Sequence, residues 1–286
     1  MPSLIDLRRR IRSVKNTQQI TKAMKMVAAA KLRRAQERVL ASRPFSQSYE
    51  KLLANVVAAA SGDERVMAHP LLALRPERKI QVILVTSDRG LAGAFNSNIN
   101  RGAQRFLDEK PGVPVQVEAI GRKGRDFFRR RGVPLSGEHQ GMLDKGLYAD
   151  AQKIAQMAMD RYQGAEADAV YLIYNEFKSV MAQRLVVKRI LPVEMPEGRQ
   201  TQDYIYEQPP DQLLSNLLPN YVSITVYAAI LESAAAEHAA RMVAMDAAST
   251  NAGKVIDALT LHLNRMRQAS ITREIIEIVS GASALD

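Results

Sequence analysis

Few residues of this chain could do chemistry, and the first candidates are the glycines of the run Gly90-Leu91-Ala92-Gly93. The run follows an apolar stretch and precedes a predicted helix, which is where a phosphate-binding turn would lie. The complete glycine fingerprint of dinucleotide-binding proteins is missing, however, and the chain contains no Walker pattern. A tight turn that needs glycine for positive φ explains the run without a ligand. We therefore expect no bound cofactor.

Side chains suited to catalysis or metal binding are scattered. No pair of histidines has metal-ligand spacing: they are His69, His139, His238 and His262. The carboxylates near the C-terminus lie on one predicted helix without a pocket around them: Glu232, Glu237, Glu274 and Glu277. Cysteine is absent, which excludes thiolate nucleophiles, disulfides and cysteine-based zinc sites. We expect no catalytic residue, no metal site and a chain that is not itself an enzyme.

The positive charge of the chain is concentrated at its N-terminus. The net charge is +10, and residues 1–43 carry twelve Lys and Arg against only Asp6 and Glu37, so the remainder is neutral. A basic helix of this kind fits a nucleic-acid partner, an acidic protein partner, a membrane surface, a targeting peptide or a solvated face of a coiled coil. No aromatic residue precedes Phe45, so the stacking groups of many nucleic-acid sites are missing. No apolar run approaches the ~20 residues that a membrane span needs.

The elements that hold these residues are organised by one long C-terminal helix. Between Asn220 and Ser280 there is no proline, and Gly253 is the only interior glycine. Apolar and small residues recur there at spacings of four and three, the heptad pattern of a coiled coil: Leu231, Ala235, His238, Met242, Met245, Ser249, Ala252, Ile256, Leu259, Leu263, Met266 and Ser270. At ~1.5 Å per residue such a helix needs a partner along its length.

The N-terminal region supplies that partner. Its apolar residues form groups with the same spacing, separated by phase shifts: Leu4, Leu7, Ile11 and Val14, then Ile20, Met24 and Val27, then Leu32, Ala35 and Val39, and later Phe45, Tyr49, Leu52, Val56 and Ala59. Ser3 and Asp6 predict a capping box at the helix start. The two helices predict an antiparallel intramolecular coiled coil.

Strands and helices alternate between these two helices, which predicts a doubly wound, Rossmann-like α/β domain with a largely parallel sheet. The expected strands are 80–86, 115–120 and 169–177, with 182–191 as one more beside them; the expected helices are 95–110, 126–131 and 147–162. The predicted organisation is therefore an N-terminal coiled-coil helix (1–60), a linker (61–78), the α/β domain (79–195), a loop (196–211) and a C-terminal coiled-coil helix (212–286).

Several stretches resemble the gamma subunit of F-type ATP synthases. The most specific is Ile271 to Ala282, read ITREIIEIVSGA, and the run Ile20 to Lys31 is nearly as diagnostic. Residues 87–98 and 239–245 resemble the family too, and the resemblance weakens between 132 and 199. Ala92 stands where many members have cysteine, so the thiol switch of plastid members is not expected.

This resemblance implies a central-stalk rotor that turns inside a ring of three alpha and three beta subunits and couples proton flow through the membrane c-ring to ATP synthesis or hydrolysis on beta. It implies contacts with alpha and beta through Lys22, Met24, Arg241, Arg267, Gln268, Thr272, Glu274 and Glu277. The loop at 196–211 would be a foot that contacts the c-ring and epsilon through Tyr204, Tyr206 and Glu207.

The expected partners are therefore the alpha, beta, epsilon and c subunits, with one copy of this chain per complex and no nucleic acid. The chain would meet the membrane only through partners, on the cytoplasmic face of a bacterial inner membrane, because it starts at Met1 without a leader and lacks the plastid cysteines. The alternative that composition leaves open is a basic coiled-coil protein that binds nucleic acid.

Overall fold

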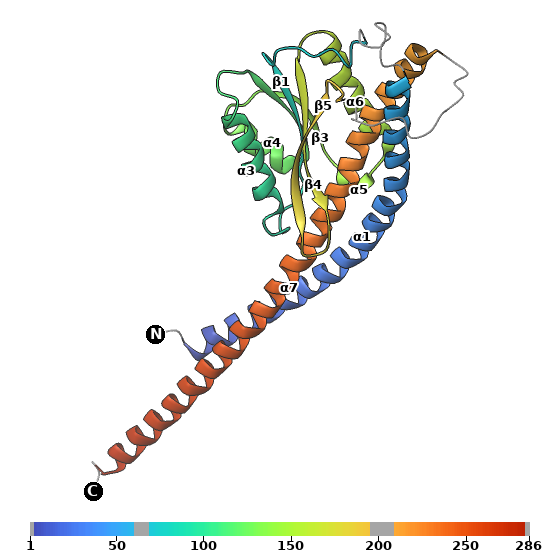
Figure 1. Cartoon of the computed structure of the whole chain (residues 1–286). Helices are drawn as coiled ribbons and strands as arrows, with labels where there is room; N and C mark the ends of the chain where they lie inside the picture. Colours follow the sequence, from blue (N-terminus) through green and yellow to red (C-terminus); the bar gives the residue numbers. More distant parts are fainter. Residues whose placement is uncertain (1–2, 60–68, 195–208, 284–286) are drawn as a thin grey trace. The chain divides into compact units, whose positions relative to one another are not determined.

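A computed structural model describes residues 3–59, 69–194 and 209–283. The chain divides into two compact units: unit 1 contains Met1–Ala28 and Met242–Asp286, and unit 2 contains Ala29–Arg241. Two long helices, α1 (Leu4–Ala59) and α7 (Pro210–Ser283), each contribute residues to both units. In Figure 1 they are the blue and the orange-red ribbons.

Unit 1 is an antiparallel pair of helices, as the sequence predicts. Gln18 of α1 donates from Nε2 to the carbonyl oxygen of Ser249 over 3.2 Å, and Lys25 pairs with Asp246 over 2.6 Å. The start of α1 carries the predicted capping box, because the Ser3 hydroxyl accepts from the Asp6 N–H while the Asp6 carboxylate accepts from the Ser3 N–H.

The predicted phase shifts in α1 are wrong. Ile20, Val27 and Phe45 are 60%, 58% and 59% exposed, whereas Thr21 and Ala28 are buried. The inward positions keep one steady spacing of three and four: Leu4, Leu7, Ile11, Val14, Gln18, Thr21, Lys25, Ala28, Leu32, Ala35 and Val39. Gln18 and Lys25 occupy this seam because α7 provides them with partners, and the Thr21 hydroxyl donates to the Gln18 carbonyl oxygen of its own helix. A prediction from hydrophobicity alone therefore chose the neighbouring apolar residues.

The predicted seam of α7 is confirmed along its whole length. All twelve predicted positions are buried or half-buried, from Leu231 at 3% exposure to Ser270. Ala and Ser allow close approach at several of these positions, and Met fills the remaining space because its side chain is flexible. From Ile271 to Ser280 every residue of α7 is exposed.

Unit 2 is built on a five-stranded sheet of order β3-β2-β1-β4-β5. The strands are β1 (Ile80–Val85), β2 (Val115–Ile120), β3 (Leu135–His139), β4 (Ala169–Phe177) and β5 (Gln183–Leu191). The first four are parallel, and β5 pairs antiparallel with β4. All six residues of β1 are buried, as expected for a central strand covered on both faces. The doubly wound prediction is confirmed.

Helices cover both faces of this sheet (Figure 1). On one face lie α3 (Phe95–Asp108) and α4 (Arg122–Arg129); on the other lie α5 (Met142–Lys145), α6 (Tyr148–Gln163) and the part of α7 in unit 2. The sequence prediction missed β3 and α5. Strand β3 contains Ser136, Gly137 and Glu138 between its ends, so it lacks an apolar alternation that would identify it.

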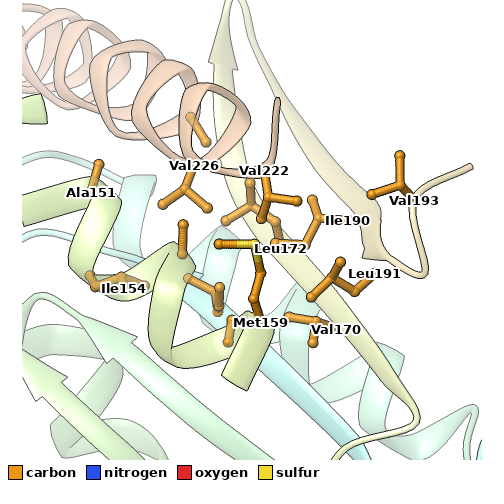
Figure 2. Packing of buried hydrophobic residues seen from close by; sticks show 14 of the residues in the cluster. Ala151, Ile154, Met159, Val170, Leu172, Ile190, Leu191, Val193, Val222 and Val226 are labelled. Atoms are coloured by element: carbon orange, nitrogen blue, oxygen red, sulfur yellow. The ribbon is translucent and has the colours of Figure 1, made fainter. Parts of the chain in front are cut away.

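The main core lies between the sheet, α6 and α7 (Figure 2). Met159 of α6 points toward Val170 and Leu172 of β4, and Val222 and Val226 of α7 close the cluster from the far side. Each of these five side chains is at most 2% exposed. Burial of one such side chain stabilises the fold by ~1.5 to 3 kcal/mol, so α7 is a structural part of unit 2.

The region Gln212–Ser280 of α7 is long and apolar enough, by length and composition alone, to cross a membrane, although no single apolar run of that length occurs. Half of its most apolar window is buried inside the protein. The buried apolar residues of this region, such as Val222 and Val226, belong to the core of unit 2.

Candidate partner-contact surfaces

The free end of α7 carries several exposed apolar side chains. Because Gln18 lies opposite Ser249 in an antiparallel pair, the start of α1 at Leu4 lies near Leu263, and α7 continues beyond it to Ser283. Its side chains there include exposed isoleucines, which are 49% to 71% accessible: Ile271, Ile275, Ile276 and Ile278. Exposed apolar side chains clustered on one helix end are typical of a surface that a partner protein covers.

The polar residues predicted to contact alpha and beta on this helix lie among those isoleucines. Arg267, Gln268, Thr272, Glu274 and Glu277 are all exposed. The Thr272 hydroxyl donates to the Gln268 carbonyl oxygen over 2.9 Å, which places the two residues one turn apart on the same face. In the described part of the chain, the Gln268 side-chain amide has no hydrogen-bond partner, so it is available to another protein.

The predicted contacts in α1 and near the middle of α7 have different environments. Lys22 is exposed and Met24 is half-buried. Arg241 points into unit 2, where its side chain is 13% exposed, and donates to the Glu237 carboxylate over 2.8 Å and to the Gly90 carbonyl over 3.1 Å. Burial raises the pKa of Glu237, but His238 and Arg241 outweigh it and hold that pKa below its ordinary value. Arg241 therefore binds its own chain.

The residues predicted to contact the c-ring and epsilon, Tyr204, Tyr206 and Glu207, lie outside the described residues. The same is true of most of the loop at 196–211 and of the predicted boundary between the N-terminal helix and the linker at residue 60.

Helix α7 also fills the crevice in which a doubly wound sheet usually binds ligands, at the carboxyl ends of neighbouring strands. At the end of β4, the Glu232 carboxylate accepts from the Phe177 N–H over 3.0 Å and the Ser233 hydroxyl accepts from the Asn175 N–H over 3.3 Å. At the end of β1, Arg241 reaches Gly90. The turn at Gly90–Gly93 is therefore a docking point for α7.

Hydrogen bonds of neighbouring residues fix the conformation of the turn at Gly90–Gly93. Leu91 and Gly93 have positive φ angles of 64° and 54°. The Asn96 side chain accepts from the Ser87 N–H over 3.0 Å, and the Ser87 hydroxyl donates to the Arg89 carbonyl over 2.6 Å. These bonds hold Leu91 outward, at 64% exposure.

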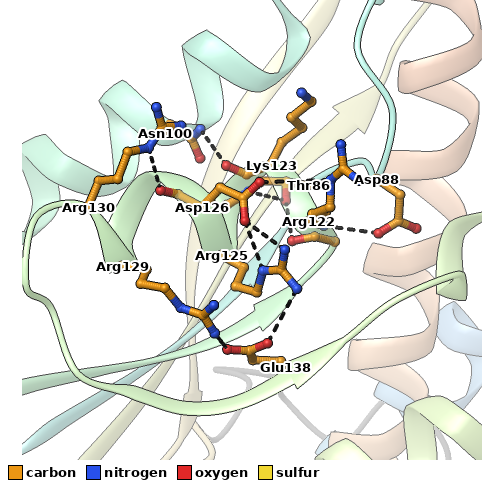
Figure 3. A network of polar contacts seen from close by, with 12 residues as sticks. Thr86, Asp88, Asn100, Arg122, Lys123, Arg125, Asp126, Arg129, Arg130 and Glu138 are labelled. Carbon is orange, nitrogen blue, oxygen red and sulfur yellow. Dashed lines mark hydrogen bonds and ion pairs between the residues drawn. The ribbon is translucent and has the colours of Figure 1, made fainter.

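A polar network around α4 connects the ends of β1, β2 and β3 (Figure 3). Asp88 accepts from the N–H groups of Arg122 and Gly141 over 3.0 and 2.8 Å, while the Thr86 hydroxyl accepts from the Gly124 N–H over 2.8 Å. Gly121 is required here, because its φ is +93° and an added Cβ would lie 2.1 Å from the Thr86 carbonyl oxygen. In the sequence, the two glycines at 121 and 124 are the feature that could have predicted this close contact between the end of β1 and the start of α4.

The arginines of α4 are held by carboxylates in the same network. Arg125 donates to Asp126 over 2.7 Å and lies 3.5 Å from Glu138, which also pairs with Arg129 (Figure 3). The hydrogen bond from Arg125 is the main reason that the pKa of Asp126 lies below its ordinary value. These pairs are partly exposed, so each contributes little stability; together they orient the basic face of α4.

A second polar cluster, which sequence reasoning missed, is buried around Glu118 of β2. We call it the Glu118 hub: Gln81, Glu118, Ser136, His139 and Arg161. Glu118 is 1% exposed and accepts from Arg161 over 2.7 Å and from Ser136 over 2.8 Å, with His139 Nε2 at 2.6 Å. Burial raises the pKa of Glu118, but the bonds from His139, Arg161 and Ser136 outweigh it and lower that pKa to about 2.

No group of three or more His, Asp or Glu that could hold a metal ion occurs within residues 3–59, 69–194 and 209–283. The polar clusters of unit 2 bind each other and the ends of the strands. They position the turn after β1 and the face of α4, and they give the protein rigid surfaces for contact.

The chain is similar to known proteins over its whole length. The ATP synthase family profile matches residues 3–285. The ATP synthase gamma chain of Solibacter usitatus (strain Ellin6076) is 58% identical over the full length of both chains, and that of Anaeromyxobacter sp. (strain Fw109-5) is 52% identical, again over the full length of both.

Solved structures have the same fold. The central stalk and c-ring structure of the Tetrahymena thermophila mitochondrial ATP synthase contains a chain that is 28% identical, with a TM-score of 0.62, over 80% of this chain and 99% of that one. A Euglena gracilis mitochondrial ATP synthase structure contains a chain with a TM-score of 0.68 at 19% identity, over 99% of this chain and 94% of that one, a likeness of fold alone. With a profile match from residue 3 to residue 285 and relatives above 50% identity, the chain belongs to the ATP synthase gamma-chain family.

Proposed function

We propose that this chain is the rotor subunit of the central stalk of an ATP synthase. It is a non-catalytic part of that complex. It turns inside the ring of three alpha and three beta subunits and couples proton flow through the c-ring to ATP synthesis or hydrolysis on beta. The observation that carries this function is the end of α7, where Ile271 to Ser280 extend beyond the paired helices with every side chain exposed.

The composition of α7 suits a surface that moves against its partner. Interface hot spots are typically Trp, Tyr and Arg in fitted pockets. No aromatic residue follows Tyr227, and Trp is absent from the chain. Small and flexible side chains let the contact change during rotation without one deep energy minimum. Contacts that differ among three catalytic subunits would give each a different nucleotide affinity, which is how rotation and catalysis become coupled.

The partners are the alpha, beta, epsilon and c subunits, with one copy of this chain per complex. As an ATP synthase subunit, the chain is part of a membrane-associated complex. We place it on the cytoplasmic face of a bacterial inner membrane, attached only through partners. Washing membranes with chelator at low salt should release it, and a requirement for detergent would contradict this placement.

The loop at 196–211 is proposed as the foot. Cross-linkers at Tyr204, Tyr206 or Glu207 should capture epsilon or c. Capture of alpha or beta alone would contradict the proposal that this loop contacts epsilon and the c-ring. The five predicted segments, with boundaries at 60, 78, 195 and 211, are the functional parts of this proposal: helix, linker, α/β domain, foot and helix.

Co-purification tests the function most directly. A tag on the chain in its native host should recover alpha, beta and epsilon in fixed proportion. The immobilised complex should rotate a probe on this chain when ATP is added. Recovery of nucleic acid without the other subunits would support the alternative of a nucleic-acid-binding coiled coil, which the family relationship does not favour.

A further inference from the structure

A cavity of about 230 Å³ lies within unit 2, where α1, α5 and α7 meet. Part of its wall is apolar and consists of residues that are at most 9% exposed: Ala35 of α1, Leu143 of α5, and Leu231 and Ala234 of α7. The contacts with alpha, beta, epsilon and c proposed above use none of the residues that line it.

The rest of the wall carries a net positive charge. Lys31, Arg34 and Arg38 follow one another along one face of α1, and Asp144 of α5 is the one carboxylate among the described residues that line the cavity. Lys31 already neutralises Asp144, over 2.7 Å. Arg38 donates one N–H to the Lys145 carbonyl oxygen over 3.3 Å, and Arg34 has no hydrogen bond or ion pair within the described part of the chain. Most of the N–H groups of the two arginines are therefore available to an anion.

His238 of α7 adds a ring nitrogen to the same wall. Its side chain is 8% exposed, and its Nδ1 lies 2.8 Å from Glu237 Oε2. The pKa of Glu237 lies below its ordinary value, so this carboxylate is ionised and only accepts, and the proton of a neutral imidazole ring belongs on Nδ1. Nε2 then presents a lone pair. In the part of the chain that the structure describes, Nε2 has no hydrogen-bond partner and, unlike Nδ1, is not fully enclosed, so a molecule in the cavity can reach it.

A ligand that fits these groups combines negative oxygen atoms with a hydroxyl group. Guanidinium groups match the oxygens of phosphate with parallel N–H donors. The hydroxyl of hydrogen phosphate can donate to the lone pair of a neutral Nε2. The volume of the cavity is roughly eight times the ~30 Å³ that one water occupies in the liquid, which leaves room for this small anion and a few waters.

We propose that this cavity binds inorganic phosphate in the form of hydrogen phosphate. The anionic oxygens accept from Arg34 and Arg38, and the hydroxyl donates to His238 Nε2. The site does not depend on the rotor function.

Calorimetric titration of the full chain with inorganic phosphate at pH 8, at constant ionic strength, tests the proposal. We expect saturable one-to-one binding. Arg34→Gln should weaken it at least about tenfold, because a charged donor is lost. Arg33→Gln is the matched control: it makes the same change of charge at the adjacent residue, whose guanidinium pairs with Glu37 over 3.3 Å and does not line the cavity. This variant should bind as the wild type does.

Two variants of His238 test the role of its ring nitrogen. His238→Asn keeps an amide near the position of Nδ1 but removes Nε2, and it should weaken binding at least about tenfold. His238→Gln has an amide that reaches the position of Nε2, and it should retain most of the affinity. Arg34 is exposed, so the comparison of Arg34→Gln with Arg33→Gln decides the matter even if a His238 variant fails to fold.

Sulfate and methyl phosphate separate the hydroxyl from the charge, because at pH 8 both are anions without a hydroxyl group. We expect each to bind at least about tenfold more weakly than inorganic phosphate. The proposal is overturned if the wild type shows no saturation, if Arg33→Gln and Arg34→Gln lose the same affinity, or if His238→Asn binds as the wild type does. Equal affinity for sulfate or for methyl phosphate would also overturn it.

Discussion

At the scale of single residues, the clearest energetic contribution comes from Glu118. Its pKa falls from 4.5 to about 2 on folding, so its ionised form stabilises the protein by roughly 3 kcal/mol at neutral pH. This contribution is complete above pH 4.5 and is lost as the pH falls toward 2. We expect Glu118→Gln to lower the free energy of unfolding at pH 7 by ~2 to 4 kcal/mol, because Arg161 loses its buried partner.

Urea denaturation of both proteins from pH 7 to pH 2 measures this effect. The difference between them should shrink below pH 4.5, because the carboxylate is then protonated in the unfolded wild type, while in the folded protein it stays ionised until the pH approaches 2. A difference that stays constant with pH would show that Glu118 acts through packing alone.

Gln268 and Thr272 provide the second prediction at this scale. Both are exposed on the free part of α7, so truncation should leave the fold and assembly intact and remove a contact of ~1 to 3 kcal/mol with the ring. We expect Gln268→Ala and Thr272→Ala to lower turnover or the ratio of proton transport to hydrolysis. Thr260→Ala is the control, because the Thr260 hydroxyl makes the same kind of bond to its own helix, to Ile256. Wild-type turnover and a wild-type ratio of proton transport to hydrolysis in both variants and in the double variant would show that these two side chains have no part in coupling.

At the scale of elements, the seam of α1 decides how the two long helices pair. Val27 and Ala28 are adjacent, but Val27 is 58% exposed and Ala28 is 1% exposed. Ala28→Asp buries a charge and should lower the free energy of unfolding by several kcal/mol. Val27→Asp introduces the same side chain at a solvated position and should change it by less than ~0.5 kcal/mol. The urea midpoints of the two variants test which of the two residues faces α7. A lower midpoint for Val27→Asp than for Ala28→Asp would mean that Val27 lies in the seam, as hydrophobicity predicted.

At the scale of the whole molecule, the structure provides surfaces for partners. Its crevice at the ends of β1 and β4 is occupied by Glu232, Ser233 and Arg241 of its own α7. We therefore expect the purified chain to hydrolyse no ATP, and hydrolysis to occur only when alpha and beta are added. A coupled-enzyme assay measures this. Turnover by the chain alone, in preparations shown by mass spectrometry to lack alpha and beta, would contradict the prediction.

The sequence by itself determined the features that follow from local periodicity. The spacing of α7 predicted all twelve inward positions, because its seam consists of apolar and small side chains throughout. Strands β2 and β4 begin and end at the predicted residues, since apolar runs with flanking turns define them without reference to the rest of the chain.

Only the tertiary structure decided the features that depend on distant partners. Gln18 and Lys25 lie in the seam of α1 because α7 places Ser249 and Asp246 opposite them. Arg241 turned inward because the turn after β1 offers it the Gly90 carbonyl, and Glu118 became a buried anion because Arg161, 43 residues away in sequence, neutralises it. A polar side chain is stable inside a protein only when a partner satisfies it, and the fold, rather than local sequence, determines which partner comes within reach.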